Sequence, residues 1–356
     1  MKNKLSVTGC LAVLCALSLP FGNIFAANNP TTVPVLVAPF GAGPLAGDTI
    51  LMNQMIQAGQ PVVLLPQETP GYIYNIREMS NPKNWKTTLF NTEDTLIQLA
   101  FKGGSDELKE FLPKQIQIKF KLLYCEAWWG GGKVFITHNP EINDVSEFKG
   151  KRISIGLRSQ SDWGVYPRLF FEYGYGITQA NSDIRHLTPV ALSQQLIDGV
   201  TDVAAGSFGT EPSRSRWVIQ QVSRKIEAAG KAVHYIGIEK SVIKKMNAKF
   251  GTTWVAIELP AGTFPGQIMP ISTAINRGYK AAHDSFPNEL AYKTIMAIAK
   301  LGPRMKQFHP IWEMWSPELM LSGLTEENVH PGAKRAYIDL GWWASRNRSA
   351  PVTYPE

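Results

Sequence analysis

The sequence predicts an α/β protein of two lobes with a ligand cleft between them, and three observations support this prediction. The chain has 356 residues, enough for two domains at roughly 150 residues per domain. Short apolar runs alternate with glycine-bearing loops and helical patterns, the order typical of a parallel sheet covered by helices. Polar loops follow several of these runs, and ligands bind at the carboxyl ends of such strands.

The first α/β set begins shortly after residue 30. An apolar run predicts a buried strand at 33–37, and Asp48 then caps a helical pattern whose apolar side chains share one face. Residues 126–132 carry two Trp and three Gly, and we expect a flexible hinge or cleft mouth there. The other elements expected are a helix to about residue 58, a strand at 62–65, a helix opened by Thr69-Pro70-Gly71, and strands at 116–124 and 133–137.

The middle of the chain repeats this order of elements. Residues 145–156 predict a short helix, a turn and a buried strand, and a polar loop and a helix to about residue 173 follow. Residues 261–267 are rich in Gly and Pro and predict a crossing between the lobes. The further elements expected are strands at 184–187, 202–205 and 233–238, and helices at 191–198, from Glu211-Pro212, at 288–300 and at 331–343.

The N-terminal 26 residues have the pattern of a secretory signal peptide. Lys2 and Lys4 precede an apolar run at 11–19, small residues suited to cleavage end at Ala26, and no acidic residue occurs before Asp48. The apolar run is shorter than the ~20 residues that a membrane-spanning helix needs. We therefore expect export to the periplasm and a mature chain that does not itself span a membrane.

Composition and charge exclude several classes of partner and cofactor. The net charge is +7, but Lys and Arg are scattered with no run longer than two, so no nucleic-acid track is indicated. The surplus suits attraction of small anions and simple solubility equally well. No two of the six His lie three to five residues apart, and neither glycine-rich nucleotide motif occurs. We expect no metal, no cofactor and no internal disulfide, because the mature chain keeps only Cys125.

A serine-hydrolase alternative rests on Ser207, which lies between a predicted strand and a predicted helix. A nucleophile elbow needs Gly two positions before the serine, and Ala205 occupies that position. The sequence favours a strand-end loop that offers backbone N–H groups and a hydroxyl to a ligand. We therefore expect a binding protein without catalytic residues.

The loop after the strand at 152–155 is suited to an anion. The guanidinium of Arg158 can grip a carboxylate, and Ser159 and Ser161 precede a helix whose free N–H groups also attract negative charge. An exposed or ion-paired Arg158 is an equal alternative. Asp162 would repel an anion or receive an amino group, unless it caps the helix that it begins, which is the interpretation that we favour.

The expected ligand-binding residues lie in strand-end loops and in the Trp-Trp-Gly stretch. They are Phe40, Gly41, Ala42, Gly43, Asn91, Thr92, Trp128, Trp129, Arg158, Ser159, Gln160, Ser161, Trp163, Ser207, Phe208 and Gly209.

Three segments resemble a known family. Residues 144–156, DVSEFKGKRISIG, are similar to the lobe-entry signature of solute-binding subunits of tripartite (TRAP) transporters. The segments PAGTFPGQ at 260–267 and HPGAKRAY at 330–337 resemble the TAXI class of these subunits. The resemblance covers about 145–337, and the ligand-facing loops at 40–45 and 159–162 depart from the family pattern.

The resemblance implies a two-lobed fold of the type II periplasmic-binding-protein class. It also implies a monomer that clamps a small organic acid and delivers it to the membrane permease of a TRAP system. One lobe should comprise residues 27–135 with 268–356, and the other residues 136–267. Two alternatives stay open, a periplasmic sensor that feeds a signalling kinase and a periplasmic enzyme on the same scaffold.

Overall fold

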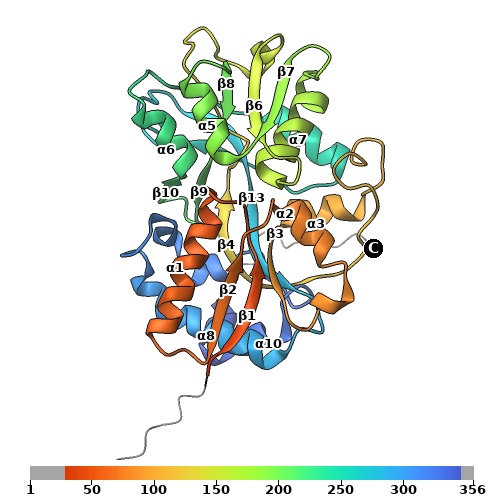
Figure 1. Ribbon diagram of the computed structural model, residues 1–356, viewed down its shortest axis with the longest axis vertical. Helices are drawn as coiled ribbons and strands as arrows, with labels where there is room; N and C mark the ends of the chain where they lie inside the picture. The colour runs from red at the N-terminus through yellow and green to blue at the C-terminus, as the bar shows by residue number, and fades with distance from the viewer. Residues whose placement is uncertain (1–28, 346–356) are drawn as a thin grey trace, which may run out of the picture.

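Two β-sheets, each covered by helices, form two lobes that meet at a waist in the computed structural model, which describes residues 29–345 (Figure 1). The fold class is the two-lobed α/β class that the sequence predicts. The predicted signal peptide lies outside the described residues. No helix in the described range is long and apolar enough to cross a membrane.

The larger lobe contains a mixed sheet of the order β10-β9-β4-β13-β3-β1-β2. Its strands are β1 (Thr31–Leu36), β2 (Val62–Gln67), β3 (Leu89–Glu93), β4 (Lys121–Trp129), β9 (Phe208–Thr210), β10 (Trp217–Ile219) and β13 (Ile271–Ala282). β1 runs parallel to β2 and β3, whereas β13 is antiparallel to β3 and β4. All five residues of β3 are buried, as expected of a strand in the middle of a sheet covered on both faces.

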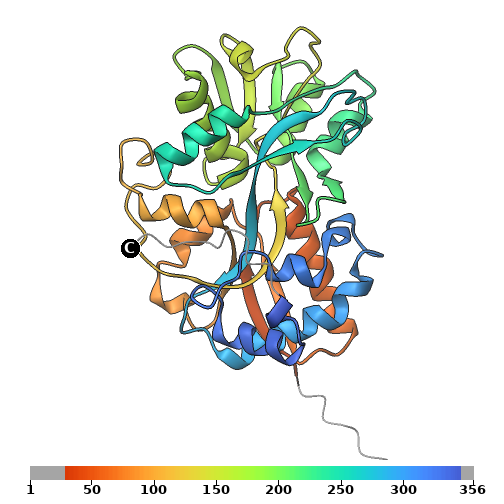
Figure 2. The same cartoon turned by 180° about the vertical axis from the view of Figure 1, so that it is seen from behind.

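Helices from both ends of the chain cover this sheet. They are α1 (Gly43–Gln57), α2 (Tyr72–Glu78), α3 (Asp94–Phe101), α8 (Asn288–Met305), α9 (Pro317–Leu321) and α10 (Pro331–Asp339), with short 3-10 turns η1 (Pro82–Asn84), η5 (Pro310–Met314) and η6 (Trp343–Ser345). Several of them begin with proline in the first turn, where its fixed φ suits the helix and its missing N–H costs nothing. The C-terminal helices lie beside α1 in the lower lobe (Figure 2).

The smaller lobe has a sheet of the order β11-β5-β8-β6-β7. Its strands are β5 (Phe135–Thr137), β6 (Arg152–Gly156), β7 (Asp183–Leu187), β8 (Val203–Ala205) and β11 (His234–Ile236). Its helical segments are η2 (Val145–Phe148), η3 (Ser161–Val165), α4 (Tyr166–Leu169), η4 (Phe170–Tyr175), α5 (Pro189–Ile197), α6 (Gln221–Ala228) and α7 (Lys240–Phe250). The strand order and parallel pairing of β6 with β7 and β8 give the open α/β arrangement that the sequence predicts.

Three connections join the lobes. The chain passes from β4 to β5 through Gly130, Gly131 and Gly132, and from β8 to β9 through residues 206–207. β13 is the third connection, because its first half pairs with β12 (Val255–Leu259) in the upper lobe and its second half pairs with β3 and β4 below (Figure 2). β9 and β10, which the expected division assigns to the second lobe, extend the sheet of the larger lobe, because β9 pairs with β4 and β10 pairs with β9. The exact lobe boundaries stay a prediction.

Several predicted elements differ from the structure. The strand expected at 116–124 is β4, which begins at Lys121 and continues through Trp129, so most of the segment expected as a flexible hinge is a strand. Residues 260–267 form the turn between β12 and β13 and not the crossing itself. The expected helix at Glu211 is a tight turn, in which the Glu211 carboxylate accepts backbone N–H groups, and the helix starts at Gln221.

Candidate ligand-binding site

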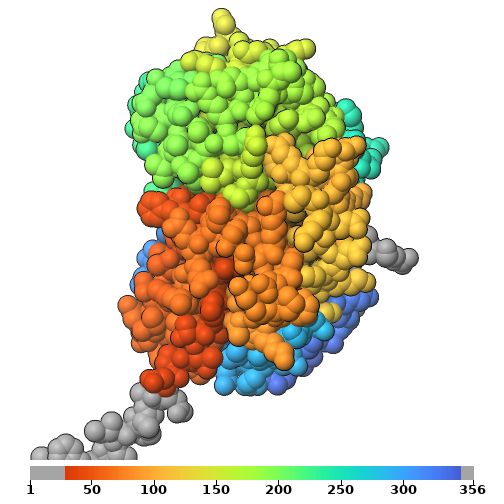
Figure 3. All heavy atoms as spheres, turned by 45° about the vertical axis from the view of Figure 1, so that its right-hand side comes forward, coloured from red at the N-terminus to blue at the C-terminus, as the bar shows by residue number. Residues whose placement is uncertain are grey.

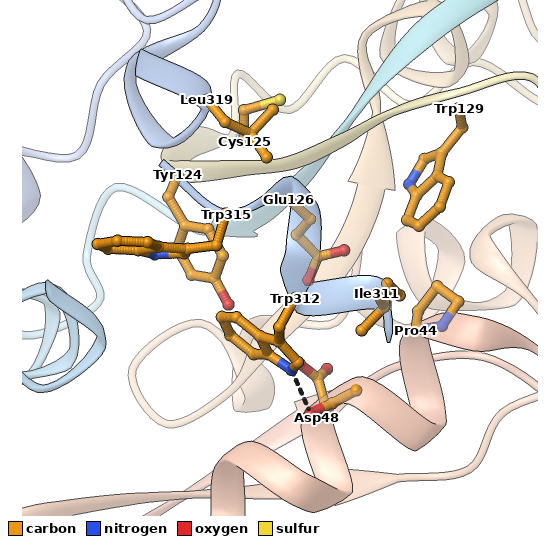
Figure 4. A pocket seen from close by; sticks show the side chains of 11 residues that line it. Pro44, Asp48, Tyr124, Cys125, Glu126, Trp129, Ile311, Trp312, Trp315 and Leu319 are labelled. Carbon is orange, nitrogen blue, oxygen red and sulfur yellow. Dashed lines mark hydrogen bonds between the residues drawn. The ribbon is translucent and has the colours of Figure 1, made fainter. Parts of the chain in front are cut away.

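Two adjoining cavities lie near the waist. The first, here called the cleft cavity, encloses about 350 Å³ and has walls from both lobes. The second, here called the aromatic cavity, encloses about 440 Å³ within the larger lobe, between α1, β4 and the segment 311–319 (Figure 4). Pro44 and Trp129 line both cavities, so the two share a wall.

The lining residues come from separate parts of the chain. The cleft cavity is lined by Ala38, Pro39, Ala42, Pro44, Gly71, Tyr72, Trp129, Gln160, Ser161, Asp162, Trp163 and Gln220. The aromatic cavity is lined by Pro44, Gly47, Asp48, Tyr124, Cys125, Glu126, Trp129, Ile311, Trp312, Trp315 and Leu319.

The wall from the smaller lobe is the tight turn that follows β6. The Gln160 side chain accepts the Leu157 N–H at 2.8 Å, which folds the chain back at the strand end. Gly156 and Gly164 permit this close approach, since a Cβ at Gly164 would lie 2.0 Å from the Leu157 carbonyl oxygen. The turn therefore presents Ser161, Asp162 and Trp163 to the cleft in a fixed arrangement.

The waist requires glycine for steric reasons. A Cβ at Gly130 would lie 2.1 Å from the Phe208 ring, and one at Gly131 would lie 2.4 Å from Oδ2 of Asp162. Gly132 has a φ of +61°, and its Cβ would lie 2.0 Å from the Asp162 carbonyl oxygen. The first interlobe connection thus packs directly against the residues that form the cleft wall.

The two lobes contact each other across the cleft, so the structure is a closed form. The Ile73 N–H donates to the Ser159 carbonyl at 3.0 Å, and the Ser159 hydroxyl donates to the Pro70 carbonyl at 2.7 Å. Deeper in the waist, the Tyr166 hydroxyl donates to Oε2 of Glu93 at 2.7 Å. Figure 3 shows the two lobes abutting on the side of residues 70–110.

Three ionisable side chains lie close together at the cleft cavity, Asp162 in its lining and Glu93 and Lys133 behind it. Burial raises the pKa of Glu93 to about 8, with a further rise from the Asp162 charge. Burial also raises the pKa of Asp162 to about 6, although Lys133 opposes this shift. Burial lowers the pKa of Lys133, whose ammonium donates to the Gly131 carbonyl at 2.8 Å and lies 5.2 Å from the centre of the Tyr166 ring. The two carboxyls are therefore held in a setting that disfavours their ionised forms.

A second charged group forms the floor of the aromatic cavity. Lys280 is fully buried and pairs with Asp48 at 2.5 Å and with Glu126 at 2.7 Å. Asn91 also accepts from this ammonium and donates to both Glu126 oxygens. Burial alone would lower the pKa of Lys280, but the two carboxylates raise it above the ordinary value. Trp312 covers the cavity and donates to the Gly47 carbonyl at 3.2 Å (Figure 4).

The structure brings some of the expected site residues together at the cleft cavity and places others elsewhere. Those that line it are Ala42, Trp129, Gln160, Ser161 and Trp163. Phe40 is 71% exposed. The next residue, Gly41, lies against Val190 of the other lobe. Gly43 is the first residue of α1 and lies beside Gln220. Asn91 supports the carboxylates below the aromatic cavity, and Thr92 is buried next to it in β3.

The remaining expected residues do not line either cavity. Arg158 is the main departure, because its guanidinium pairs with Glu110 at 3.2 Å on the outer side of the turn. Its neighbour Ser159 makes the closing contact to Pro70. Trp128 donates to Ser322 on the face of β4 opposite its neighbour. Ser207, Phe208 and Gly209 form the second interlobe connection and its strand.

Sequence reasoning missed the acidic and aromatic residues of the larger lobe. Asp48 was expected only as a helix cap, and Tyr72, Glu126, Trp312 and Trp315 were not singled out. The only sequence signal for them is the unusual number of Trp, ten in the whole chain. Their common surface depends on contacts between residues more than 200 positions apart, such as Trp312 with Gly47 and Lys280 with Asp48, which no local pattern reveals.

The geometry that a hydrolase requires is not found at Ser207. Its backbone N–H donates to the Ser223 hydroxyl, and its own Oγ has no hydrogen-bond partner in the described part of the chain. An activated serine needs an adjacent base. Within residues 29–345, no group of three or more metal-ligating side chains is close enough to hold a metal ion.

The model of the NMT1-like family matches residues 132–341, more than half of the chain. The chain belongs to the NMT1-like family. The match covers the whole smaller lobe and the C-terminal part of the larger one. A search of curated proteins finds no matching relative.

Many solved structures are similar in fold to this NMT1-like protein. One is MatC from Rhodopseudomonas palustris with bound malate, at 12% identity, covering 88% of this chain and 99% of that one, with a TM-score of 0.49. Another is the periplasmic aliphatic sulphonate binding protein SsuA from Escherichia coli, at 11% identity, 91% and 80% coverage, and a TM-score of 0.36. A third, from R. palustris and solved with adipate, has 12% identity, 80% and 88% coverage, and a TM-score of 0.45.

Proposed function

We propose that this NMT1-like protein is a periplasmic solute-binding protein that captures a small organic molecule between its lobes and delivers it to a membrane permease. The observation that carries the proposal is the cleft cavity, whose walls come from two lobes that three connections join. A ligand held in such a place contacts both lobes and favours their closed arrangement. Family membership and the two-lobed fold support the same role.

The finer predictions from the sequence belong to this proposal. A permease of the tripartite type is the partner that the TAXI resemblance implies, and the N-terminal pattern supports export. A sensor that feeds a signalling kinase would use the same cleft and differ only in its partner. A small organic acid is the solute that the sequence predicts, on the basis of Arg158 and the loop hydroxyls. The cleft cavity, without Arg158, supports the solute-binding role independently of that choice.

The test is to identify a solute that the protein holds. Protein purified from its own periplasm without denaturation is analysed by native mass spectrometry, and the same sample is then unfolded to release small molecules. We expect a defined small organic molecule at up to one copy per chain. The stripped and refolded protein should regain thermal stability when this molecule is added back.

Variants at the cleft provide the control. Trp163→Ala removes an aromatic wall of the cleft cavity, whereas Trp254→Phe changes a buried Trp that packs on Tyr166 and Phe170 away from the lining. The first variant should lose retention of the solute, and the second should keep it. Equal retention by both would place the solute outside the cleft and contradict the proposal.

A further inference from the structure

Both cavities are lined by carboxylates without a cationic partner in the lining. Asp162 lines the cleft cavity, and Asp48 and Glu126 line the aromatic cavity. Among the described residues that line either cavity there is no Lys, Arg or His. An anionic solute would therefore meet negative charge on the walls and no guanidinium or ammonium to offset it.

The cations that lie behind the walls are already engaged. Lys280 serves two carboxylates at 2.5 and 2.7 Å, so the group of Asp48, Glu126 and Lys280 has one negative charge in surplus when all three are ionised. The charge of Lys133 acts on both Asp162 and Glu93, and its ammonium donates to the Gly131 carbonyl. The group of Asp162, Glu93 and Lys133 thus has two carboxyls and one cation.

The other lining groups suit an apolar or aromatic body. Trp129 lies between the two cavities, its indole turned to the aromatic cavity (Figure 4). It is 2% exposed, and its Nε1 has no hydrogen-bond partner in the described part of the chain. Tyr72 and Trp163 supply two further rings on the cleft side. Aromatic faces of this kind attract cations and pack against flat or aliphatic bodies.

We infer that the solute of this site carries a protonated nitrogen, held at Asp162, on an apolar or aromatic body that lies against Trp129 and Trp163. A cation placed there offsets the surplus negative charge and lets the half-buried Asp162 carboxylate ionise at little cost. This inference rests on the proposed function, because it names the class of solute that the same cleft takes. It gives the solute the opposite sign to the one that Arg158 suggests.

The first experiment is a thermal-shift screen of stripped protein with sets of three matched compounds. Each set has one body and differs only in its head group, for example 3-phenylpropylamine, 3-phenylpropanoate and 3-phenylpropanamide, or butylamine, butanoate and butanamide. The amines should raise the melting temperature, and the matched acids and amides should not. Hits confined to carboxylates or amides would overturn the inference and leave the proposed function standing. A screen without any hit, on protein that also retains no small molecule, would contradict both.

The second experiment separates the role of Asp162 from a general effect on folding. Asp162→Asn keeps the shape and removes the charge, and Asp198→Asn makes the same change at an exposed position of the same lobe. Since a charge-assisted contact is lost, Asp162→Asn should weaken amine binding by about 10- to 100-fold, measured by calorimetry. The variant should be at least as stable as the parent, because the raised pKa of Asp162 shows that the folded protein disfavours its ionised form. Unchanged affinity in Asp162→Asn would overturn the inference.

Discussion

At the scale of single residues, Lys280 has a large expected effect on stability. Its fully buried ammonium neutralises Asp48 and Glu126, and breaking a buried pair by removing one partner leaves an uncompensated charge. We expect Lys280→Met to lower the free energy of unfolding by about 3–5 kcal/mol, measured by urea denaturation. Lys293→Met, at an exposed pair with Glu289, is the matched control and should change it by less than about 1 kcal/mol. Equal effects in the two variants would contradict this account of the buried group.

Glu93 makes the stability of the protein depend on pH. Its pKa in the folded protein is about 8, above the ordinary value of 4.5, so the folded state binds more protons than the unfolded state between these values. Stability is then fully present below about pH 4.5 and is lost as the pH rises through 8. Because one pKa unit corresponds to ~1.4 kcal/mol, the loss from this group across pH 5–8 is on the order of a few kcal/mol.

The comparison of the parent with Glu93→Gln tests this assignment. The variant has no carboxyl to titrate and keeps an acceptor for the Tyr166 hydroxyl. Its melting temperature should fall less between pH 5 and pH 8 than that of the parent protein. Parallel curves for the two proteins would show that Glu93 titrates near its ordinary pKa.

The residue scale is also where sequence reasoning reached least far. Arg158 follows a strand end and precedes a helical segment, and its prediction as a wall residue used only that position. The turn that Gln160 closes places Asp162 inward, while Arg158 pairs with Glu110 outside. Side-chain direction within a tight turn depends on such contacts, and the sequence shows only the order of the residues. The loop as a whole was predicted correctly as part of the α/β framework.

At the scale of elements, the glycines of the first connection determine how closely the lobes pack. Gly132→Ala should destabilise the protein by roughly 1–3 kcal/mol from its positive φ, with an added cost because its Cβ would lie 2.0 Å from the Asp162 carbonyl oxygen. Gly176→Ala is the control, since Gly176 has a φ of +69° and no atom within 4 Å of its Cβ. Thermal unfolding should show a clearly larger loss for Gly132→Ala, and equal losses would contradict the crowding at the waist.

Elements with strong local signals were predicted well, and elements defined by distant pairing were not. The short helix η2, with its capping box of Asp144 and Glu147, and the strand β6 that follows it lie where the sequence places them. The sequence analysis did not predict β13. This strand runs for 12 residues through both lobes, so its pattern of apolar and polar residues reflects two different environments. β4 was predicted to stop at residue 124, since the Trp-Trp-Gly stretch suggested a mouth. Its pairing with β13 extends it to Trp129.

At the scale of the whole molecule, net charge and local charge differ. The chain carries +7, yet carboxylates alone supply the charged side chains of both cavity linings. A total charge describes solubility and long-range attraction, and it does not determine the sign of a site. The two-lobed architecture could be predicted from the repeated order of elements, but the chemistry of the cleft depends on segments that only the fold brings together.

Closure of the lobes is the motion that this architecture predicts. The contacts that hold the closed form include those of Ser159 with Pro70 and Ile73, the Tyr166–Glu93 hydrogen bond and the Arg158–Glu110 ion pair, and an open form would exchange them for contacts with water. Small-angle scattering should show a smaller radius of gyration when the retained solute is added to stripped protein. An unchanged radius with bound solute would show that the lobes stay closed without it.

The measurement that tests the central claim most directly is hydrogen–deuterium exchange of stripped protein with and without the retained solute. A solute held between the lobes should protect segments on both sides of the cleft together. These are residues 38–44, 71–73 and 124–129 of the larger lobe and 157–163 of the smaller one. Protection confined to one lobe, or found only away from these segments, would contradict the account.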